Sequence, residues 1–483
     1  MITPEILDKY EMTIGIECHV QLATVSKLFS GADNNARDKA PNEATSPIDF
    51  GLPGMLPVLN HEAIRLAVRA GKALNADIAH VSRFDRKHYF YPDLPKGYQI
   101  TQMYQPIIIG GFVEAPMLDG STVKVRIHHA HIEEDAGKLT HHSGFSLVDL
   151  NRAGTPLIEV VSEPDIHSAA GAKAFATELQ RLMTFSGASY GDLYQGNMRF
   201  DVNLSVALKG ATELGTRAEV KNLNSFRSVE KAAEYEYIRQ IEILEKGEKV
   251  VQETRGWDDA TAKTSSQRSK EDAQDYRYMP DADIPPVVLT ADEIAAIQAE
   301  VPPLPAYYRQ KWASMGLDLS VVNALLNDVT YANTVLLAQE KGDAIAKVVA
   351  HWFASAVGTE DEKTTATSEG FHPERFIELA IMFTGNEISS TAAKQIFNEL
   401  LTTDKTPRQI AESQNLLQVS DESAIQVIVD EVLNDPASAQ SVADIRDGQD
   451  KAIGFLVGQV MKKSAGKANP GLAQQLIRKS ING

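Results

Sequence analysis

The sequence predicts an α+β protein: a first part built on a mixed, largely antiparallel sheet with flanking helices, followed by helical parts. Up to about residue 290, strand-like and helix-like segments do not alternate regularly, so a doubly wound parallel sheet is not expected. A proline-rich turn at 280–286 then marks a change, and from Ala291 onward apolar residues recur at helical spacing. A chain of 483 residues is expected to form about two to four domains.

Three short segments of the first part alternate apolar and polar residues, as strands do when their two faces meet different surroundings. They span residues 14–22, 199–205 and 217–221. Their polar faces carry Glu17, His19 and Gln21 on the first, Arg199, Asp201, Asn203 and Ser205 on the second, and Arg217, Glu219 and Lys221 on the third. If the strands are neighbours, these faces form a floor of carboxylates and cations, which a site for Mg²⁺ and phosphate requires. The alternative is a set of half-solvated strands that expose charge to water.

Helices are expected wherever apolar residues recur three to four positions apart. In the first part they span residues 62–74, 170–185 and 225–246, the last ended by Gly247. Further on they span 294–300, 307–315, 320–327, 344–357 and 391–401, followed by a helix that begins at Pro407 and a compact helical unit across 423–480. Residues 358–370 are expected to form a surface loop.

The composition restricts the class of protein. Hydrophobic residues make up 43% and charged residues 23%, as in a soluble globular protein, and no apolar run is long enough to span a membrane. The N-terminus has no signal-peptide pattern. The only cysteine, Cys18, falls on the apolar face of the first strand, which excludes disulfides within the chain and a cysteine-built zinc site. A reducing, cytoplasmic location is therefore expected.

The net charge of −18 argues against a broad electrostatic contact with nucleic acid, but the charge is unevenly placed. Acids are frequent between residues 401 and 450, and none follows Asp450. The basic residues of this last stretch are Lys451, Lys462, Lys463, Lys467, Arg478 and Lys479. They predict either a local contact with phosphate or charges that balance helix C-termini.

Two further segments concentrate residues that carry chemistry. Residues 84–99 pack basic and aromatic side chains around two prolines, an arrangement that holds a base or a phosphate, or that covers a core. Residues 128–142 contain five of the twelve histidines and the consecutive acids Glu133, Glu134 and Asp135. Consecutive carboxylates suit a hard cation such as Mg²⁺ better than zinc, while tandem histidines are also common in exposed loops.

Glu159 is the one acid inside the apolar run 157–161. A carboxylate in a buried strand is costly unless it is paired or binds a metal, so Glu159 indicates either a functional ligand or an outward-facing side chain. The chain has no Walker P-loop, Rossmann glycine pattern, nucleophile elbow or kinase signature, so a nucleotide site must be of another design.

The segments 14–22, 84–99, 133–138, 149–165 and 218–226 together resemble the family of B subunits of the glutamyl/aspartyl-tRNA amidotransferase, and the resemblance covers essentially the full length. It implies three domains: a catalytic cradle related in fold to glutamine synthetase at 1–293, a helical domain at 294–405, and a YqeY-like tail at 406–483 that contacts tRNA.

The resemblance also implies an enzyme, a ligase that forms a carbon–nitrogen bond and depends on ATP and Mg²⁺. It would phosphorylate the side-chain carboxylate of Glu-tRNA(Gln), Asp-tRNA(Asn) or both. Ammonia released from glutamine by a separate amidase subunit would then displace phosphate, and a small third subunit would tie the two large subunits together. No amidase-type serine-rich signature is visible, so the chain is not expected to release its own ammonia.

The resemblance assigns roles to individual residues. The metal ligands are expected to be Glu17, His19, Glu134, Glu159 and Glu219, with Mg²⁺ held by Glu17, Glu134 and Glu219. The expected catalytic residues are Asp201, Glu219, Lys221 and Asn222, and the expected nucleotide contacts are Arg86, Lys87, Asn151, Arg199 and Asn203.

The sequence departs from the family pattern at two places. Many members carry a zinc-binding cysteine cluster after the first strand, whereas residues 29–35 contain no cysteine, so no zinc is expected. Gln21 stands where a glutamate is frequent, so this position is not expected to be an essential metal ligand. Two other functions remain open: a tRNA-binding scaffold without catalysis, and a stand-alone carboxylate–amine ligase acting on a free amino acid.

Overall fold

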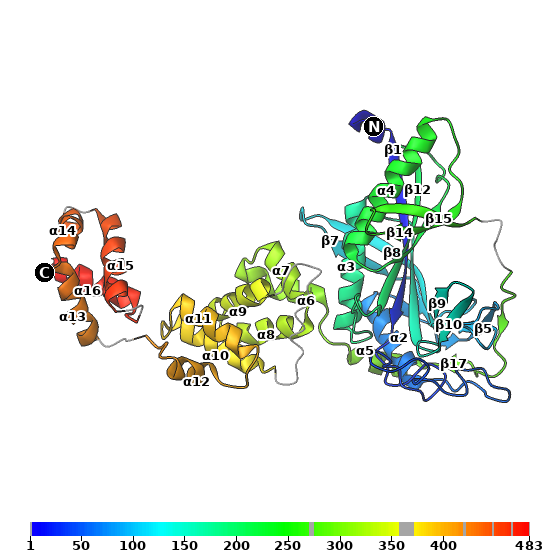
Figure 1. Cartoon of the computed structure of the whole chain (residues 1–483), viewed down its shortest axis with the longest axis horizontal. Coiled ribbons are helices and arrows are strands. Elements are labelled where there is room, and N and C mark those ends of the chain that lie inside the picture. Colours follow the sequence, from blue (N-terminus) through cyan, green and yellow to red (C-terminus); the bar gives the residue numbers. More distant parts are fainter. Residues whose placement is uncertain are drawn as a thin grey trace. The chain divides into compact units, whose positions relative to one another are not determined.

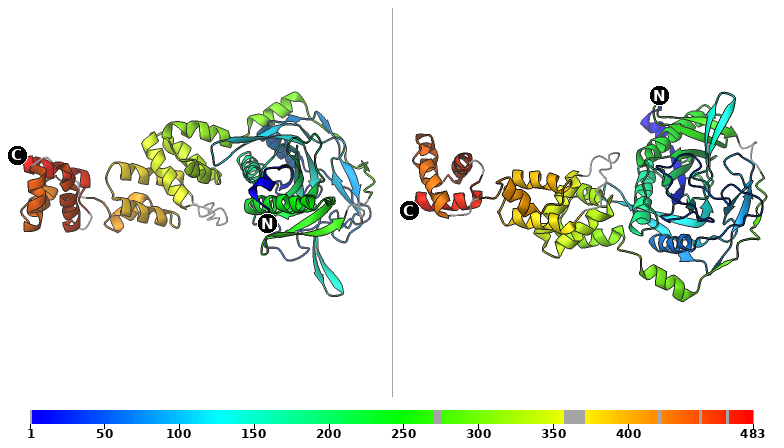
Figure 2. Two further views of the ribbon diagram at one scale, coloured as in Figure 1. Left: turned by 90° about the horizontal axis from the view of Figure 1, so that it is seen from above. Right: turned by 60° about the horizontal axis from the view of Figure 1, so that its bottom comes forward.

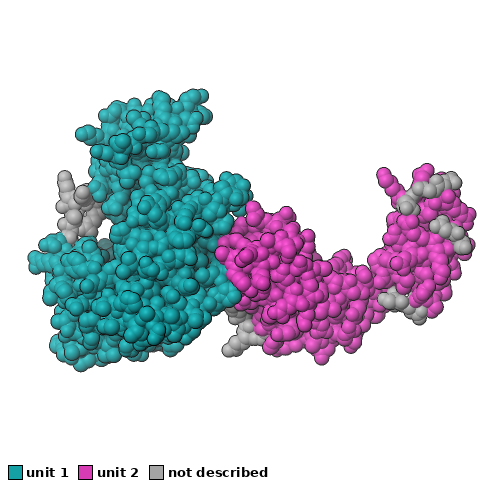
Figure 3. Space-filling model, turned by 180° about the vertical axis from the view of Figure 1, so that it is seen from behind, with its two compact units in different colours: residues 1–305 teal, residues 306–483 magenta. Residues whose placement is uncertain are grey.

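The computed structural model describes residues 2–269, 275–356, 371–418, 422–446, 449–464 and 467–482. The chain divides into two compact units, residues 1–305 and 306–483, which are coloured separately in Figure 3. The surface loop expected at 358–370 lies outside the described residues.

A ten-stranded sheet forms the centre of the first unit (Figure 1). Its order is β15 (Lys263–Ser269), β14 (Glu253–Asp258), β13 (Ala218–Leu223), β12 (Met198–Leu208), β1 (Tyr10–Gln21), β11 (Pro156–Ser162), β8 (Thr122–Glu134), β6 (Ile108–Ile109) and β2 (Asp77–Ile78), and β7 (Phe112–Pro116) also pairs with β8. The pairing of β13 with β14 is parallel, and the other pairings in this sheet are antiparallel. The prediction of a mixed, largely antiparallel sheet is confirmed.

One face of the sheet is apolar and packs against helices. The inward-facing residues of β1 include Ile14, Ile16, Cys18 and Val20, each at most 1% exposed. They share a core with α2 (His61–Ala73), α3 (Ala169–Phe185) and α4 (Phe226–Glu245). Figure 1 shows α3 and α4 beside the sheet. Cys18 is therefore a small buried hydrophobe, as its place on the apolar face predicts.

These helices begin and end at the residues that their sequences favour. The Ser168 hydroxyl accepts a hydrogen bond from the Gly171 N–H at the start of α3, and Ser225 caps α4 in the same way. Gly247 follows the end of α4 with φ of 76°, a left-handed conformation that glycine adopts without strain. The three helices predicted in the first part are confirmed to within one residue at each end.

Smaller sheets lie beside the large one. One consists of β16 (Met279–Pro280), β4 (Asp85–His88) and β5 (Tyr98–Thr101), and a hairpin consists of β9 (Lys138–His142) and β10 (Phe145–Asp149). Figure 1 shows β5, β9 and β10 on the side of the large sheet away from α3 and α4. The unit is completed by α1 (Pro4–Leu7), the pair β3 (Val81–Ser82) and β17 (Val287–Val288), and α5 (Ala291–Ala299). The polar face of the large sheet is thus partly enclosed rather than covered by helices.

The second unit is helical. It contains α6 (Pro305–Trp312), α7 (Leu319–Leu325), α8 (Val329–Gln339), α9 (Asp343–Ala356), α10 (Pro373–Thr384), α11 (Ser390–Leu400), α12 (Pro407–Ser413), α13 (Glu422–Leu433), α14 (Ala439–Arg446), α15 (Ile453–Lys463) and α16 (Pro470–Asn482), most of them visible in Figure 2. The last four share a small core that includes Val429, Leu456 and Ile477. The predicted helical second part is confirmed. Among the described residues, no helix has the length and apolarity needed to cross a membrane.

Candidate active site

The register of the large sheet brings the predicted polar faces together. Glu17 of β1 lies opposite Asp201 of β12, and His19 lies between Arg199 of β12 and Glu159 of β11. Side chains at paired positions of neighbouring strands point to the same face. The strands predicted from alternation are therefore neighbours, and their polar side chains form one continuous surface.

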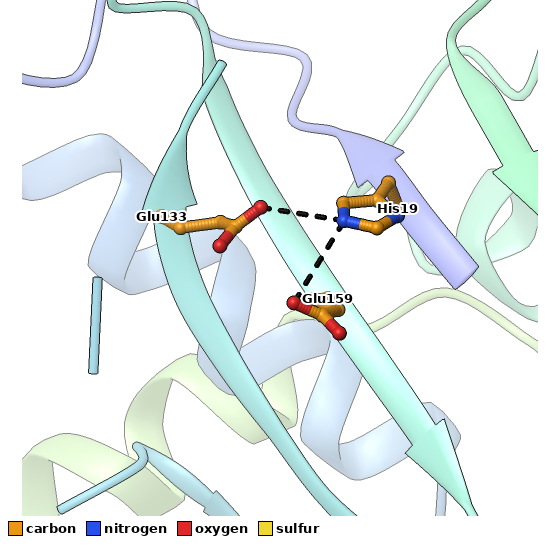
Figure 4. Close-up of side chains that lie close together, drawn as sticks. All are labelled: His19, Glu133 and Glu159. Carbon is orange, nitrogen blue, oxygen red and sulfur yellow. Dashed lines mark ion pairs between the residues drawn. The ribbon is translucent and has the colours of Figure 1, made fainter. Parts of the chain in front are cut away.

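The first cluster on this surface, the His19 cluster, consists of His19, Glu133 and Glu159 (Figure 4). The Nε2 atom of His19 lies 3.4 Å from Glu133 Oε1 and 3.7 Å from Glu159 Oε2. The three side chains come from β1, β8 and β11 and point toward one another. His131 closes the other side, with its Nε2 atom 3.2 Å from Glu159 and 3.6 Å from Glu133.

Burial and close contacts set the charge of this cluster. Burial acts to lower the pKa of His131, but its hydrogen bonds to Glu133 and Glu159 outweigh burial and raise it to about 9. Burial acts to raise the pKa of Glu159. The hydrogen bond from His131 and the positive charges of His131, His19 and Lys87 outweigh burial and hold this pKa below its ordinary value. The pKa of Glu133 is lowered in the same way, against burial, by His131 and His19. Both carboxylates are therefore ionised at neutral pH.

The second cluster, the Glu17 cluster, consists of Glu17, Asp201 and Glu219, whose ligand atoms lie within 4.8 Å of one another. The Nζ atom of Lys221 lies 2.8 Å from Asp201 and 2.7 Å from Glu219. The amide nitrogen of Asn203 donates to Glu17 at 2.9 Å. Burial, together with the charges of Glu159 and Glu219, raises the pKa of Glu17. The cluster therefore holds more negative charge than Lys221 alone offsets.

A bulge between β12 and β13 positions Asp201. The register shifts between Phe200 and Val202, and Asn222 on the facing strand adopts φ of 62°. Asparagine tolerates this left-handed conformation better than most residues. The Asn222 N–H consequently points at Asp201 and donates to its Oδ1 at 2.8 Å. Asn222 thus acts on the site through its backbone.

Two of the predicted cations border the clusters. Arg199 pairs with Asp135 at 3.0 Å. Lys87 lies with its Nζ atom 5.0 Å from the centre of the Tyr276 ring. Burial acts to lower the pKa of Lys87, but Glu133, Glu159 and neighbouring tyrosines outweigh it and raise the pKa. Lys87 therefore stays charged beside the His19 cluster.

Three predicted site residues are not brought to either cluster. Glu134 follows Glu133 on β8, and strand alternation turns it away from His19 and toward Lys96 and the Ile100 N–H, which bind it. Arg86 pairs with Asp281 at 2.7 Å and Asp283 at 2.8 Å, and so secures the 280–286 turn. The side-chain amide of Asn151 is bonded to the backbone of residues 40 and 44.

The structure adds residues that the sequence interpretation did not assign. Glu133 rather than Glu134 lies beside His19, and His131 lies within 3.6 Å of both carboxylates of the His19 cluster. Thr254 of β14 donates to Glu219 at 2.9 Å. Alternation along β8 places His131 and Glu133 on the same face of that strand. Only the pairing of β8 with β11, which sets His131 opposite Glu159, shows that this face belongs to the cluster.

Glu133→Gln is expected to weaken the binding of Mn²⁺, a paramagnetic substitute for Mg²⁺, about tenfold or more, because it removes one carboxylate of the His19 cluster. Glu134→Gln is the matched control on the next residue. It is expected to leave Mn²⁺ affinity unchanged and to lower the free energy of unfolding by about 1.5–3 kcal/mol, since it weakens a buried charged hydrogen bond with Lys96. Electron paramagnetic resonance titration and urea denaturation measure the two effects. The opposite pattern would restore Glu134 as the ligand.

A buried ion pair closes the loop after β1. This loop contains residues 29–35, where many family members carry zinc-binding cysteines and this chain has none. Lys27, which is fully buried, lies 3.4 Å from Asp49, and Ser30 donates to Asp49 at 3.0 Å. The Ser46 N–H also donates to Asp49, at 2.8 Å. Burial lowers the pKa of Lys27 while Asp49 opposes that change. A lysine ammonium and serine hydroxyls do not fit a zinc site, whose ligands are thiolates, imidazoles and carboxylates.

Asp49→Asn is expected to lower the free energy of unfolding by about 3–5 kcal/mol, because it leaves Lys27 charged and buried without a counter-ion. The control is Asp33→Asn, which breaks the exposed pair with Lys39 in the same loop and is expected to leave stability unchanged. Urea denaturation measures both, and added zinc is expected to change neither curve. A stabilising effect of zinc on the original chain would contradict the assignment.

Two family descriptions match the chain. The "GatB/GatE catalytic domain" matches residues 12–295, and the "GatB domain" matches residues 336–481. The first match contains both carboxylate clusters, and the second contains most of the helical unit.

Curated relatives match over nearly the whole length. A protein of Trichodesmium erythraeum, named as the B subunit of an aspartyl/glutamyl-tRNA(Asn/Gln) amidotransferase, is 43% identical, covering 100% of this chain and 99% of its own length. Proteins of the same name from Teredinibacter turnerae and Brevibacillus brevis are 44% and 41% identical, covering 98% and 99% of this chain. They cover 99% and 100% of their own lengths.

Proposed function

Because the chain belongs to the GatB family of amidotransferase B subunits, we propose that it catalyses the ATP-dependent amidation of misacylated tRNA. A side-chain carboxylate oxygen of Glu-tRNA(Gln) or Asp-tRNA(Asn) bonds to the γ-phosphorus of ATP, and ADP leaves. Ammonia then bonds to the carbonyl carbon, phosphate leaves with the bonding electrons, and nitrogen loses a proton. The amidase subunit supplies the ammonia by hydrolysing glutamine, and the small third subunit joins the complex.

The observation that carries this proposal is the placement of two carboxylate clusters side by side on one sheet face. Glu17 and His19 are alternate residues of β1, so the clusters are neighbours on the same surface. Lys221 lies in one, and Lys87 lies beside the other. Transfer of phosphate to a carboxylate brings two anions together, and preorganised cations at that point lower the barrier. A tRNA-binding scaffold has no need of this arrangement.

Both clusters supply the carboxylate oxygens that Mg²⁺ prefers, three in the Glu17 cluster and two, with one imidazole, in the His19 cluster. Glu17, Asp201 and Glu219 would hold one ion, and His19, Glu133 and Glu159 another. Burial raises the pKa of Glu17 most, and the neighbouring carboxylates Glu159 and Glu219 raise it further; a bound cation would relieve both costs. Bound there, Mg²⁺ would act as a Lewis acid and would offset the negative charge that develops on the transferred phosphate. Lys221 and the Asn222 N–H hold Asp201 in position.

We assign the remaining parts as residues 1–293 for catalysis, 294–405 as a helical domain, and 406–483 as a tail that contacts tRNA. Lys462 and Lys463 lie in the last turn of α15, and Lys479 lies in the last turn of α16. These positions suit the negative end of a helix dipole. All three side chains are exposed, but Lys463 lies 3.0 Å from Glu431 and Lys479 lies 3.7 Å from Glu422, so a phosphate backbone that binds them would compete with these acids.

Trapping the intermediate tests the proposal. Hydroxylamine attacks an acyl phosphate, so the complex incubated with Glu-tRNA(Gln), ATP and Mg²⁺ but no glutamine is expected to give γ-glutamyl hydroxamate on the tRNA. Mass spectrometry of the released amino acid detects it. Binding of the tRNA without hydroxamate formation would support the scaffold function, and hydroxamate from free glutamate would support the stand-alone ligase.

A further inference from the structure

A cleft of about 260 Å³ opens on the polar sheet face beside Glu17, on the side away from His19. Its lining includes Gly15 and Glu17 of β1, Asn203 of β12 and Arg217. Gly15 lies opposite Asn203, and the missing side chain leaves room between the strands and the loop before β13. The cleft is therefore continuous with the Glu17 cluster.

The size of the cleft restricts what it holds. It is smaller than the roughly 300–1,000 Å³ of pockets that bury a whole drug-sized ligand. A nucleotide or the terminal nucleoside of a tRNA exceeds it, whereas a phosphate chain fits. The cleft thus takes part of a larger ligand, and that part ends beside the three carboxylates of the Glu17 cluster.

The cations near the cleft differ in their availability. Lys221 is held by both Asp201 and Glu219 and already neutralises their charge. Arg217 is exposed and forms no ion pair with any residue that the structure describes. Its guanidinium is a planar fork that binds two phosphate oxygens at once. Arg217 is therefore the cation in the cleft that is available to an anionic ligand.

A buried acceptor in the cleft also lacks a partner. The Asn203 amide nitrogen donates to Glu17, but its Oδ1 atom is buried and accepts no hydrogen bond from the part of the chain that is described. Buried polar atoms are nearly always bonded, so this oxygen marks a place for a donor from outside the chain. A water of a hydrated Mg²⁺ is such a donor.

We propose that this cleft takes the phosphate chain of ATP and that Arg217 positions it, so that the γ-phosphate lies against the Glu17 cluster. This rests on the function proposed above. The carboxylates of the Glu17 cluster would hold the metal ion, and Arg217 would offset the negative charge of the phosphates. A phosphodiester of the tRNA acceptor end has the same chemistry, and the experiment separates the two sources.

The test uses the assembled complex with its amidase and small subunits. Arg217→Ala is expected to raise the KM for ATP about tenfold or more, since it removes a charged hydrogen-bonding partner, and to leave the KM for Glu-tRNA(Gln) within twofold. Arg217→Lys keeps the positive charge but loses the planar guanidinium, and its KM for ATP is expected to lie between the values of the original complex and of Arg217→Ala. Binding of a non-hydrolysable ATP analogue by calorimetry, without tRNA, is expected to weaken by the same factor.

Lys209→Ala is the matched control, because it removes an exposed cation close to Arg217 in sequence that does not line the cleft. It is expected to leave both KM values unchanged. Gly15→Ala narrows the cleft without a steric clash, since the added Cβ lies 3.7 Å from the Ser162 carbonyl oxygen, and it is expected to weaken analogue binding. A rise in the KM for tRNA alone, or no change in either KM, would overturn the proposal. If the unmodified complex showed no ATP turnover with misacylated tRNA, this would instead contradict the proposed function.

Discussion

Asp201→Asn is expected to lower kcat for ATP turnover by about 10²-fold or more. Asparagine still accepts the hydrogen bond from the Asn222 N–H, so the bulge is retained. The variant loses one of the three carboxylates that would hold Mg²⁺, and one of the two carboxylates that pair with Lys221. Steady-state ATP hydrolysis by the complex in the presence of misacylated tRNA measures the effect.

The control for this variant is Glu213→Gln, which removes an exposed carboxylate from the loop before β13. It is expected to leave kcat within twofold. Circular dichroism is expected to show the same folded content for both variants. An Asp201→Asn enzyme with normal kcat would place phosphoryl transfer outside the Glu17 cluster.

Glu159→Gln is expected to have a comparable effect, about 10²-fold to 10³-fold on kcat, and to raise the Mg²⁺ concentration needed for half-maximal turnover. Glu159 is a shared partner of His19 and His131, so its charge is lost to both sides of the His19 cluster. The uncharged carbonyl oxygen of glutamine is a weaker ligand than a carboxylate for a hard cation. A titration of turnover against Mg²⁺ concentration separates the two expected effects.

Glu114→Gln serves as the control for Glu159→Gln. Glu114 lies in the same sheet, on β7, where it pairs with Lys124 in solvent. It is expected to keep the original kcat and Mg²⁺ dependence. If Glu159→Gln behaved like this control, the His19 cluster would be structural, and only the Glu17 cluster would remain as a candidate metal site.

Alternation along single strands was sufficient to predict which polar side chains share one surface. It places Glu17 and His19 on one face of β1 and Asp201 and Asn203 on one face of β12, and the structure brings these faces together. The reason is physical: a strand with one buried face has no freedom to turn its polar residues inward. The apolar partners of the same strands, such as Cys18, were predictable for the same reason.

Contacts between distant segments were not predictable from local pattern. Arg86 binds Asp281, 195 residues away, and therefore secures a turn instead of facing the site. The choice between Glu133 and Glu134 depends on which face of β8 meets β11, and two adjacent carboxylates give no local signal for it. The bulge that puts Asn222 in a left-handed conformation depends likewise on its pairing with β12.

The proposed reaction transfers phosphate from ATP to the amino acid carried by a misacylated tRNA. The most direct measurement is ATP hydrolysis in Mg²⁺ by the complex with its amidase and small subunits, with and without Glu-tRNA(Gln) or Asp-tRNA(Asn). Turnover stimulated by charged tRNA, and absent in Asp201→Asn, is the predicted result, with Gln-tRNA(Gln) or Asn-tRNA(Asn) appearing when glutamine is supplied. Tight binding of the charged tRNAs without any stimulation of ATP hydrolysis would contradict it.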